Sequence, residues 1–140
     1  MATFTSQIFE ILTLNGDNVG SSVTQTINNI NYVDNRILSI PTGSVTTIFN
    51  LDATPGAGTF VTSSVQYIRI TNNSAVAPVK IIISSSTEAM SYLIATGSSY
   101  MLSTSKMTSN ESGFNFADIK SVKLQPTGSV ASVEYYIATT

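Results

Sequence analysis

The sequence contains no cysteine, no histidine and no tryptophan. Without cysteine the chain can form neither a disulfide bond nor a thiolate metal site, and without histidine it lacks the commonest metal ligand and general base. A Ser-His-Asp catalytic triad is therefore excluded. Phosphate-binding glycine patterns are also missing, because Gly56 and Gly58 are not followed by Lys and Ser or Thr at the start of a helix. We expect no metal and no cofactor, so stability must come from packing and backbone hydrogen bonds.

Charged residues are scarce as well. They make up 10% of the chain, against roughly 25% in an average domain. The six Lys and Arg residues are spread singly and the net charge is -2, so there is no basic stripe to neutralise nucleic-acid phosphates. No run approaches the roughly 18 consecutive apolar residues of a membrane-spanning helix, and the first residues lack the pattern of a signal peptide. We expect a soluble protein, made in the cytoplasm, that binds neither nucleic acid nor membrane.

Hydroxyl and amide side chains take the place of the missing charges. The chain has 21 Ser, 19 Thr and 11 Asn residues, which favour turns and strand surfaces and compete with the backbone inside helices. A surface with so little charge has little electrostatic repulsion between neighbouring molecules. The composition therefore disfavours helix and permits self-association, although it fits a weakly charged monomeric domain equally well.

Short apolar runs recur between turn residues, at the spacing typical of a sandwich or barrel. In the clearest run, residues 130–137, apolar and polar side chains alternate as expected of a strand with one buried face. The predicted strands are residues 8–14, 36–40, 45–51, 65–71, 79–83, 90–95, 99–103, 119–124 and 130–137. The predicted core consists of Phe49, Ile68, Ile70, Ile81, Ile83, Val133, Tyr135 and Ile137.

The pentapeptide Pro-Thr-Gly-Ser-Val occurs twice, at residues 41–45 and 126–130. Proline sets φ near about -65° and glycine two residues later can adopt a positive φ, which suits a tight turn with a bulge. Each copy therefore predicts a hairpin: residues 36–40 pair with 44–51, and residues 119–125 pair with 130–138.

Taken together, these patterns predict one all-β domain over residues 1–140, an antiparallel β-sandwich of jelly-roll-like topology. An up-and-down barrel is the alternative. Residues 52–59 are a loop by composition. Residues 15–35, rich in Asn, Ser and Thr, fit either long loops or an extended arm within the first 35 residues. We hypothesise that this segment becomes ordered only on contact with another subunit.

No pattern in the sequence indicates catalysis. The eight acidic residues show no paired spacing and no Asp cluster for Ca²⁺. Ser103 and Lys106 have the spacing of a Ser-Lys dyad, but without a helix this spacing does not bring them together. We therefore predict that the protein is not an enzyme.

Candidate binding residues are the outward tyrosines and the scattered apolar residues near the N-terminus. Tyrosine combines a large apolar area with a hydroxyl, so Tyr67 and Tyr136 are either ordinary exposed aromatics or interface anchors. Val23, Ile27 and Ile30 are too scattered for a core of their own. These five residues form the predicted interface.

Five segments of the second half of the chain resemble small virion proteins of tailed bacteriophages. They are residues 67–73 (Tyr-Ile-Arg-Ile-Thr-Asn-Asn), 78–83, 95–102 (Ala-Thr-Gly-Ser-Ser-Tyr-Met-Leu), 118–124 and 133–138. The resemblance implies a compact β-sandwich on the surface of a particle. It carries over no functional residue.

Three classes of function follow. The first is a structural virion protein, most simply a capsid decoration protein, with copies of itself and a major capsid or tail protein as partners. A tail or fibre component for host adsorption belongs to the same class. The second is a carbohydrate-binding, lectin-like module, which the missing Trp disfavours. The third is an enzyme, for which the usual constellations are missing.

Overall fold

The computed structural model describes residues 2–61, 65–103 and 119–140, and within these residues the chain forms strands, turns and loops without any helix. The predicted all-β class is therefore confirmed. The first strands are β1 (Ala2–Phe9), β2 (Thr13–Leu14), β3 (Asp17–Asn18), β4 (Ser22–Ile30), β5 (Tyr32–Ile40), β6 (Thr46–Asp52) and β7 (Thr59–Val61). The remaining strands are β8 (Val65–Asn72), β9 (Val79–Ser84), β10 (Ala89–Ile94), β11 (Ser99–Leu102), β12 (Ser121–Pro126) and β13 (Ala131–Thr139).

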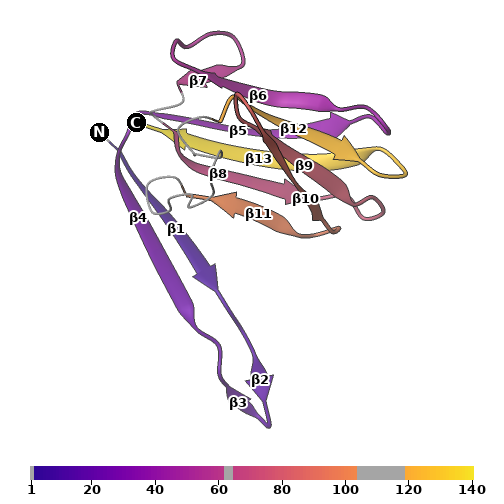
Figure 1. Ribbon diagram of the computed structural model, residues 1–140. Coiled ribbons are helices and arrows are strands. Elements are labelled where there is room, and N and C mark those ends of the chain that lie inside the picture. Colours follow the sequence, from indigo (N-terminus) through magenta and orange to yellow (C-terminus); the bar gives the residue numbers. More distant parts are fainter. Residues whose placement is uncertain (1, 62–64, 104–118) are drawn as a thin grey trace.

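Two sheets pack face to face to form the sandwich (Figure 1). The five-stranded sheet has the order β10-β9-β12-β6-β7, and the four-stranded sheet has the order β11-β8-β13-β5. From β5 onward the chain changes sheet at every connection except β6 to β7 and β9 to β10. This alternation is the topology of a jelly roll, so the predicted sandwich is confirmed and the up-and-down barrel is not formed.

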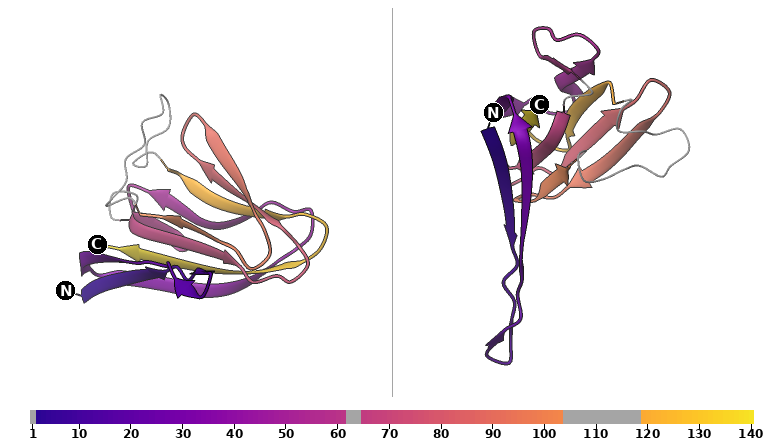
Figure 2. Two further views of the ribbon diagram at one scale, coloured as in Figure 1. Left: turned by 90° about the horizontal axis from the view of Figure 1, so that it is seen from below. Right: turned by 90° about the vertical axis from the view of Figure 1, so that its left-hand side faces the viewer.

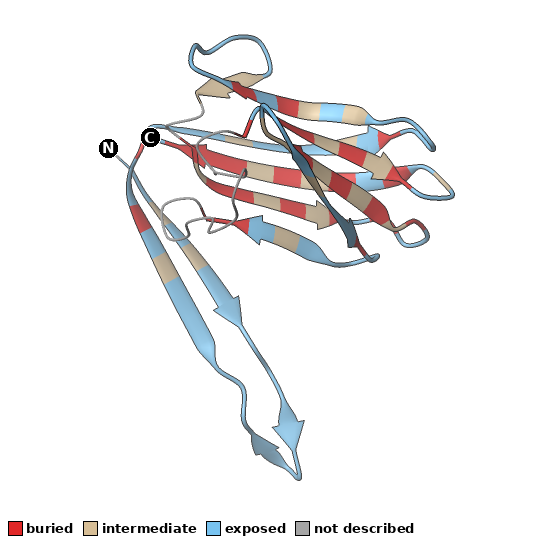
Figure 3. Cartoon of the chain, viewed as in Figure 1, coloured by how far each residue is buried: buried red, intermediate tan, exposed pale blue. Residues whose placement is uncertain are grey.

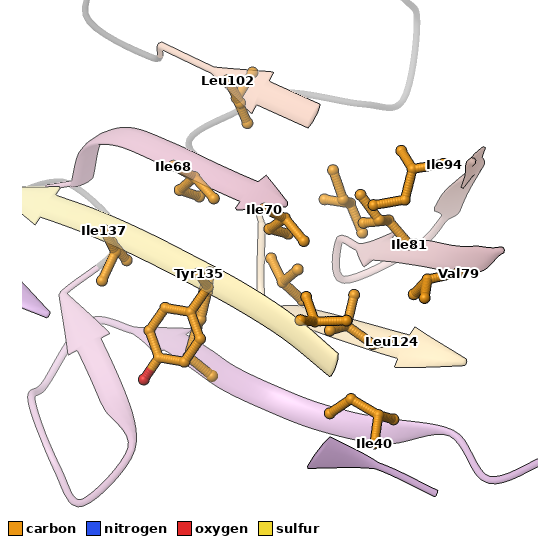
Figure 4. Close-up of a cluster of buried hydrophobic side chains, with 14 of the residues drawn as sticks. Ile40, Ile68, Ile70, Val79, Ile81, Ile94, Leu102, Leu124, Tyr135 and Ile137 are labelled. Atoms are coloured by element: carbon orange, nitrogen blue, oxygen red, sulfur yellow. The ribbon is translucent and has the colours of Figure 1, made fainter. Parts of the chain in front are cut away.

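The core lies between the two sheets. All eight predicted core residues are buried, and the side chains of Ile70, Ile81, Val133 and Ile137 are fully inaccessible to solvent. Figure 4 shows Ile70, Ile81 and Ile137 among the side chains that point from both sheets into one cluster. The alternation of apolar and polar residues therefore predicted the phase of the central strands correctly.

The two Pro-Thr-Gly-Ser-Val segments do not form the predicted hairpins. β5 and β6 lie in different sheets, and so do β12 and β13. Both segments carry the chain across the end of the sandwich, and Gly43 and Gly128 have the expected positive φ of 73° and 96°. The turn chemistry was read correctly but the pairing was wrong, because β5 pairs with β13 and β6 with β12. A strand with one buried face is compatible with either arrangement.

Residues 15–35, expected to form either long loops or an extended arm, contain strands that the sequence pattern did not indicate. The segment includes β3, β4 and the first part of β5. Most of β4 is exposed, so it lacks the apolar alternation that reveals a half-buried strand. The strand predicted at residues 8–14 is divided between the end of β1 and β2. The predicted loop at residues 52–59 is confirmed between β6 and β7.

A buried asparagine holds two of the crossing connections together. Asn72, the last residue of β8, is fully buried and donates hydrogen bonds from its amide nitrogen to the carbonyl oxygens of Ala77 at 2.9 Å and Ala95 at 3.2 Å. Its side-chain oxygen accepts a hydrogen bond from the Ser74 amide at 3.0 Å. One side chain thus joins the end of β8, the loop before β9 and the loop after β10. The buried Ala77 carbonyl and Ser74 amide obtain their hydrogen-bond partners in this way.

Candidate functional site: the projecting arm

β1 and β4 form an antiparallel hairpin that extends well beyond the sandwich (Figures 1 and 2). We call residues 2–30 the arm. At its tip β2 pairs with β3 across Asn15 and Gly16, which have positive φ values of 52° and 91°. An Asn-Gly pair with two positive φ values is the preferred two-residue hairpin turn. This dipeptide is the signal by which the sequence could have revealed that the arm is a hairpin.

The base of the arm packs on the outer face of the four-stranded sheet. The ring of Phe4 lies 4.8 Å from that of Tyr67 and 5.4 Å from that of Tyr136. Ile27 and Ile30 of β4 complete this second apolar cluster, which also includes Ala138 of β13. Burial against these rings raises the pKa of the Tyr136 phenol. The base of the arm is therefore anchored to the sandwich by these contacts.

Beyond its base the arm is exposed to solvent (Figure 3), and its exposed residues include large apolar ones. The most exposed are Ile11 at 83% and Phe9 at 67%. The others are Ile8, Leu12, Leu14, Val19 and Val23. An isolated two-stranded hairpin is only marginally stable in water, and a large contiguous apolar patch on a protein surface marks an interaction site. The arm thus has the character of a docking element.

The five residues of the predicted interface fall into two groups. Ile27, Ile30 and Tyr67 are buried in the cluster at the arm base, and Tyr136 packs against it. Their contacts lie within one chain. Only Val23 is exposed, on β4 next to Ile8 of β1. The sequence interpretation missed the exposed residues 9–14, because it assigned them to a strand of the sandwich.

The arm carries negative charge only. Glu10 and Asp17 lie in it, and no Lys or Arg occurs before Arg36. Glu10 accepts a hydrogen bond of 2.6 Å from the Ser21 hydroxyl across the hairpin. The arm therefore offers a partner two carboxylates and a strip of apolar side chains.

The outer face of the five-stranded sheet carries the complementary groups. Val79, Ile81 and Leu124 are buried in the core, so Lys80, Ile82 and Lys123 point outward by the alternation of a strand. Lys123 lies opposite Ile82 in the strand register. Leu93, 64% exposed, lies opposite Lys80. Within the described ranges the only ion pairs are Arg36–Asp34 and Arg69–Glu134, so both lysines are available for a partner. We call Lys80, Ile82, Leu93 and Lys123 the basic face.

Comparison with protein-family models and with curated proteins finds no match to this chain. In the part of the chain that the structure describes, no three Asp or Glu side chains come together in a way that could hold a metal ion. Over the same residues there is no helix long and apolar enough to span a membrane. Lys106, the lysine of the Ser-Lys spacing, lies outside the described residues.

Two tyrosines with raised pKa values should make the free energy of unfolding depend on pH in the alkaline range. Burial raises the pKa of Tyr135 to about 12, helped by its hydrogen bond to Asp34, and burial beside Tyr92 raises the pKa of Tyr100 to about 12. Unfolded tyrosine titrates near pH 10. Because the folded pKa values are the higher ones, their contribution is complete below pH 10 and is lost as the pH rises towards 12. Urea unfolding across this range should give a falling free energy of unfolding.

The control for this titration is the double variant Tyr100→Phe/Tyr135→Phe, which lacks both phenols. It should show a shallower decline with pH, because the two phenols no longer contribute. The titration of lysine and arginine is the same in both proteins. Identical slopes for the two proteins would contradict the assignment to these phenols.

Proposed function

We propose that this chain is a non-enzymatic structural virion protein, a capsid decoration protein that docks through its arm onto copies of itself and onto the particle surface. The observation that carries the proposal is the arm, because its exposed apolar side chains have no partner in the sandwich. The jelly roll is used by viral capsid proteins and by lectins alike, so the fold adds only compatibility. The resemblance to small virion proteins of tailed bacteriophages supports the same class.

The partner surface for self-association is the basic face of a second copy. The carboxylates of Glu10 and Asp17 complement Lys80 and Lys123, and Ile82 and Leu93 offer apolar area to the arm's Phe9 and its neighbours. A chain with 10% charged residues has little long-range repulsion to oppose this contact. Burying the arm would also remove the exposure that makes a lone hairpin marginal.

A charge-reversal experiment tests this contact. Light scattering after size exclusion should give an oligomer for the unaltered chain, with weaker association in high salt. Glu10→Lys should weaken association, and so should the double variant Lys80→Glu/Lys123→Glu. Combining all three substitutions should restore part of the lost association, since the opposite charges then face each other again. Glu88→Lys, a matched change in the loop between β9 and β10, should have no effect.

Two results together would overturn the proposal. If the protein is a monomer at every concentration and is also missing from purified particles of its source, it has no role in assembly. Mass spectrometry of density-banded particles provides the second measurement, and peptides of this chain should be found in them. Rescue by the triple charge reversal identifies the basic face as the contact, and failure of rescue places the arm on another surface.

A further inference from the structure

A pocket opens at the edge of the sandwich, between β5 of the four-stranded sheet and β7 of the five-stranded sheet. Its volume is about 420 Å³, within the range of roughly 300–1,000 Å³ usual for small-molecule sites. Its walls combine aromatic rings, one charged pair and a glycine-containing loop. The arm takes no part in it.

One wall is aromatic. Tyr32, 51% exposed, lies with its ring 5.8 Å from that of Phe60 and tilted by 45°. Phe60 meets the buried Phe49 edge to face at 5.8 Å, and Phe49 in turn contacts Tyr135 at 5.7 Å. These contacts support the wall from the core, so the exposed ring of Tyr32 presents a positioned apolar surface to the pocket.

The other wall is an ion pair whose carboxylate accepts a hydrogen bond from a tyrosine hydroxyl. Asp34 accepts a hydrogen bond of 2.6 Å from the Tyr135 hydroxyl and one of 3.0 Å from Nε of Arg36. The Asp34 side chain is only 14% exposed, whereas that of Arg36 is 62% exposed. The terminal nitrogens of the guanidinium group and the remaining lone pairs of the carboxylate are free for a ligand. Figure 4 shows the Tyr135 hydroxyl directed away from the aliphatic cluster.

The chemistry of these walls selects one class of ligand. The charges of Asp34 and Arg36 cancel, so the pocket does not require a charged ligand. A donor and an acceptor stand side by side, as a pair of vicinal hydroxyl groups requires, because each hydroxyl both donates and accepts. The aromatic wall suits the apolar C–H face of a sugar ring, and Gly56 and Gly58 leave the loop side without large side chains. We infer that this pocket binds a neutral sugar residue.

Binding to a glycan array, followed by calorimetric titration with the glycans that bind, tests this inference. The labelled full-length protein should bind neutral glycans. Tyr32→Ala and Arg36→Ala should each weaken that binding by roughly tenfold or more, through loss of the stacking surface and of the charged donor. Tyr92→Ala is the matched control, because Tyr92 is an exposed aromatic of β10 outside the pocket. It should bind as the unaltered protein does.

Three results would overturn the inference: no binding of any neutral glycan, binding of acidic glycans alone, or full binding by Tyr32→Ala. A β-type circular dichroism spectrum for each variant shows that a loss of binding is not a loss of fold. The arm variant Ile11→Ser/Leu12→Ser should retain sugar binding, so this test and the assembly test fail or succeed independently.

Discussion

Replacing Ile137 by Ala is expected to lower the free energy of unfolding by about 2–5 kcal/mol, the usual cost of removing a buried isoleucine side chain beyond Cβ. Ile137 is fully buried and lies in β13, which pairs with β5 on one side and β8 on the other. Neighbouring strands that are hydrogen-bonded on both edges cannot easily move to close the cavity. Urea or thermal unfolding of the purified variant gives the value.

Ile37→Ala is the matched control for this substitution. Ile37 is the same residue type in the adjacent strand β5, but 68% of it is exposed on the outer face of the sheet. Its truncation should change stability by less than about 0.5 kcal/mol. A larger loss for Ile37→Ala than for Ile137→Ala would mean that the sheet faces are assigned the wrong way round, since a shift of one residue exchanges the two faces of a strand.

Replacing Asn72 by Ala is expected to cost about 2–4 kcal/mol, because one change removes several hydrogen bonds, including those to the buried Ala77 carbonyl and Ser74 amide. The Ala77 carbonyl would lose its donor and the Ser74 amide its acceptor, whereas the Ala95 carbonyl would keep the Ser98 amide as a donor at 3.2 Å. Both affected loops cross between the sheets, so losing these hydrogen bonds weakens the connections between the two sheets. Chemical unfolding measures the change in free energy.

Two further variants separate the hydrogen bonds of the Asn72 side chain from a general effect of replacing asparagine in this segment. Asn73→Ala removes the same side chain one residue later, at an exposed position, and should cost less than about 0.5 kcal/mol. Asn72→Asp keeps the acceptor for Ser74 but loses the amide donors, so it should be destabilised in the same direction as Asn72→Ala. A fully stable Asn72→Asp variant would show that the two carbonyl contacts contribute nothing.

The sequence by itself determined the strand class and the inward-facing residues. With few charges and many β-branched, Ser and Thr residues, the chain has no amphipathic helical period to compete with strand alternation. Residues such as Ile81 and Val133 were assigned to the core correctly for that reason. Gly43 and Gly128 were likewise assigned to positive φ, because this property depends only on a few local residues.

Tertiary structure alone decided which strands pair and where the exposed surfaces lie. The two Pro-Thr-Gly-Ser-Val turns are compatible with a hairpin or with a crossing between sheets, and only the pairing of β5 with β13 and of β6 with β12 selects the crossing. The edge pocket joins Asp34 to Tyr135, a contact between residues about a hundred positions apart that local pattern cannot predict. Ile27 and Tyr67 were selected as interface residues, but packing buried them within the chain and left Phe9 and Ile11 exposed. Local sequence fixes which face of a strand is apolar, whereas what covers that face depends on contacts between segments distant in the chain.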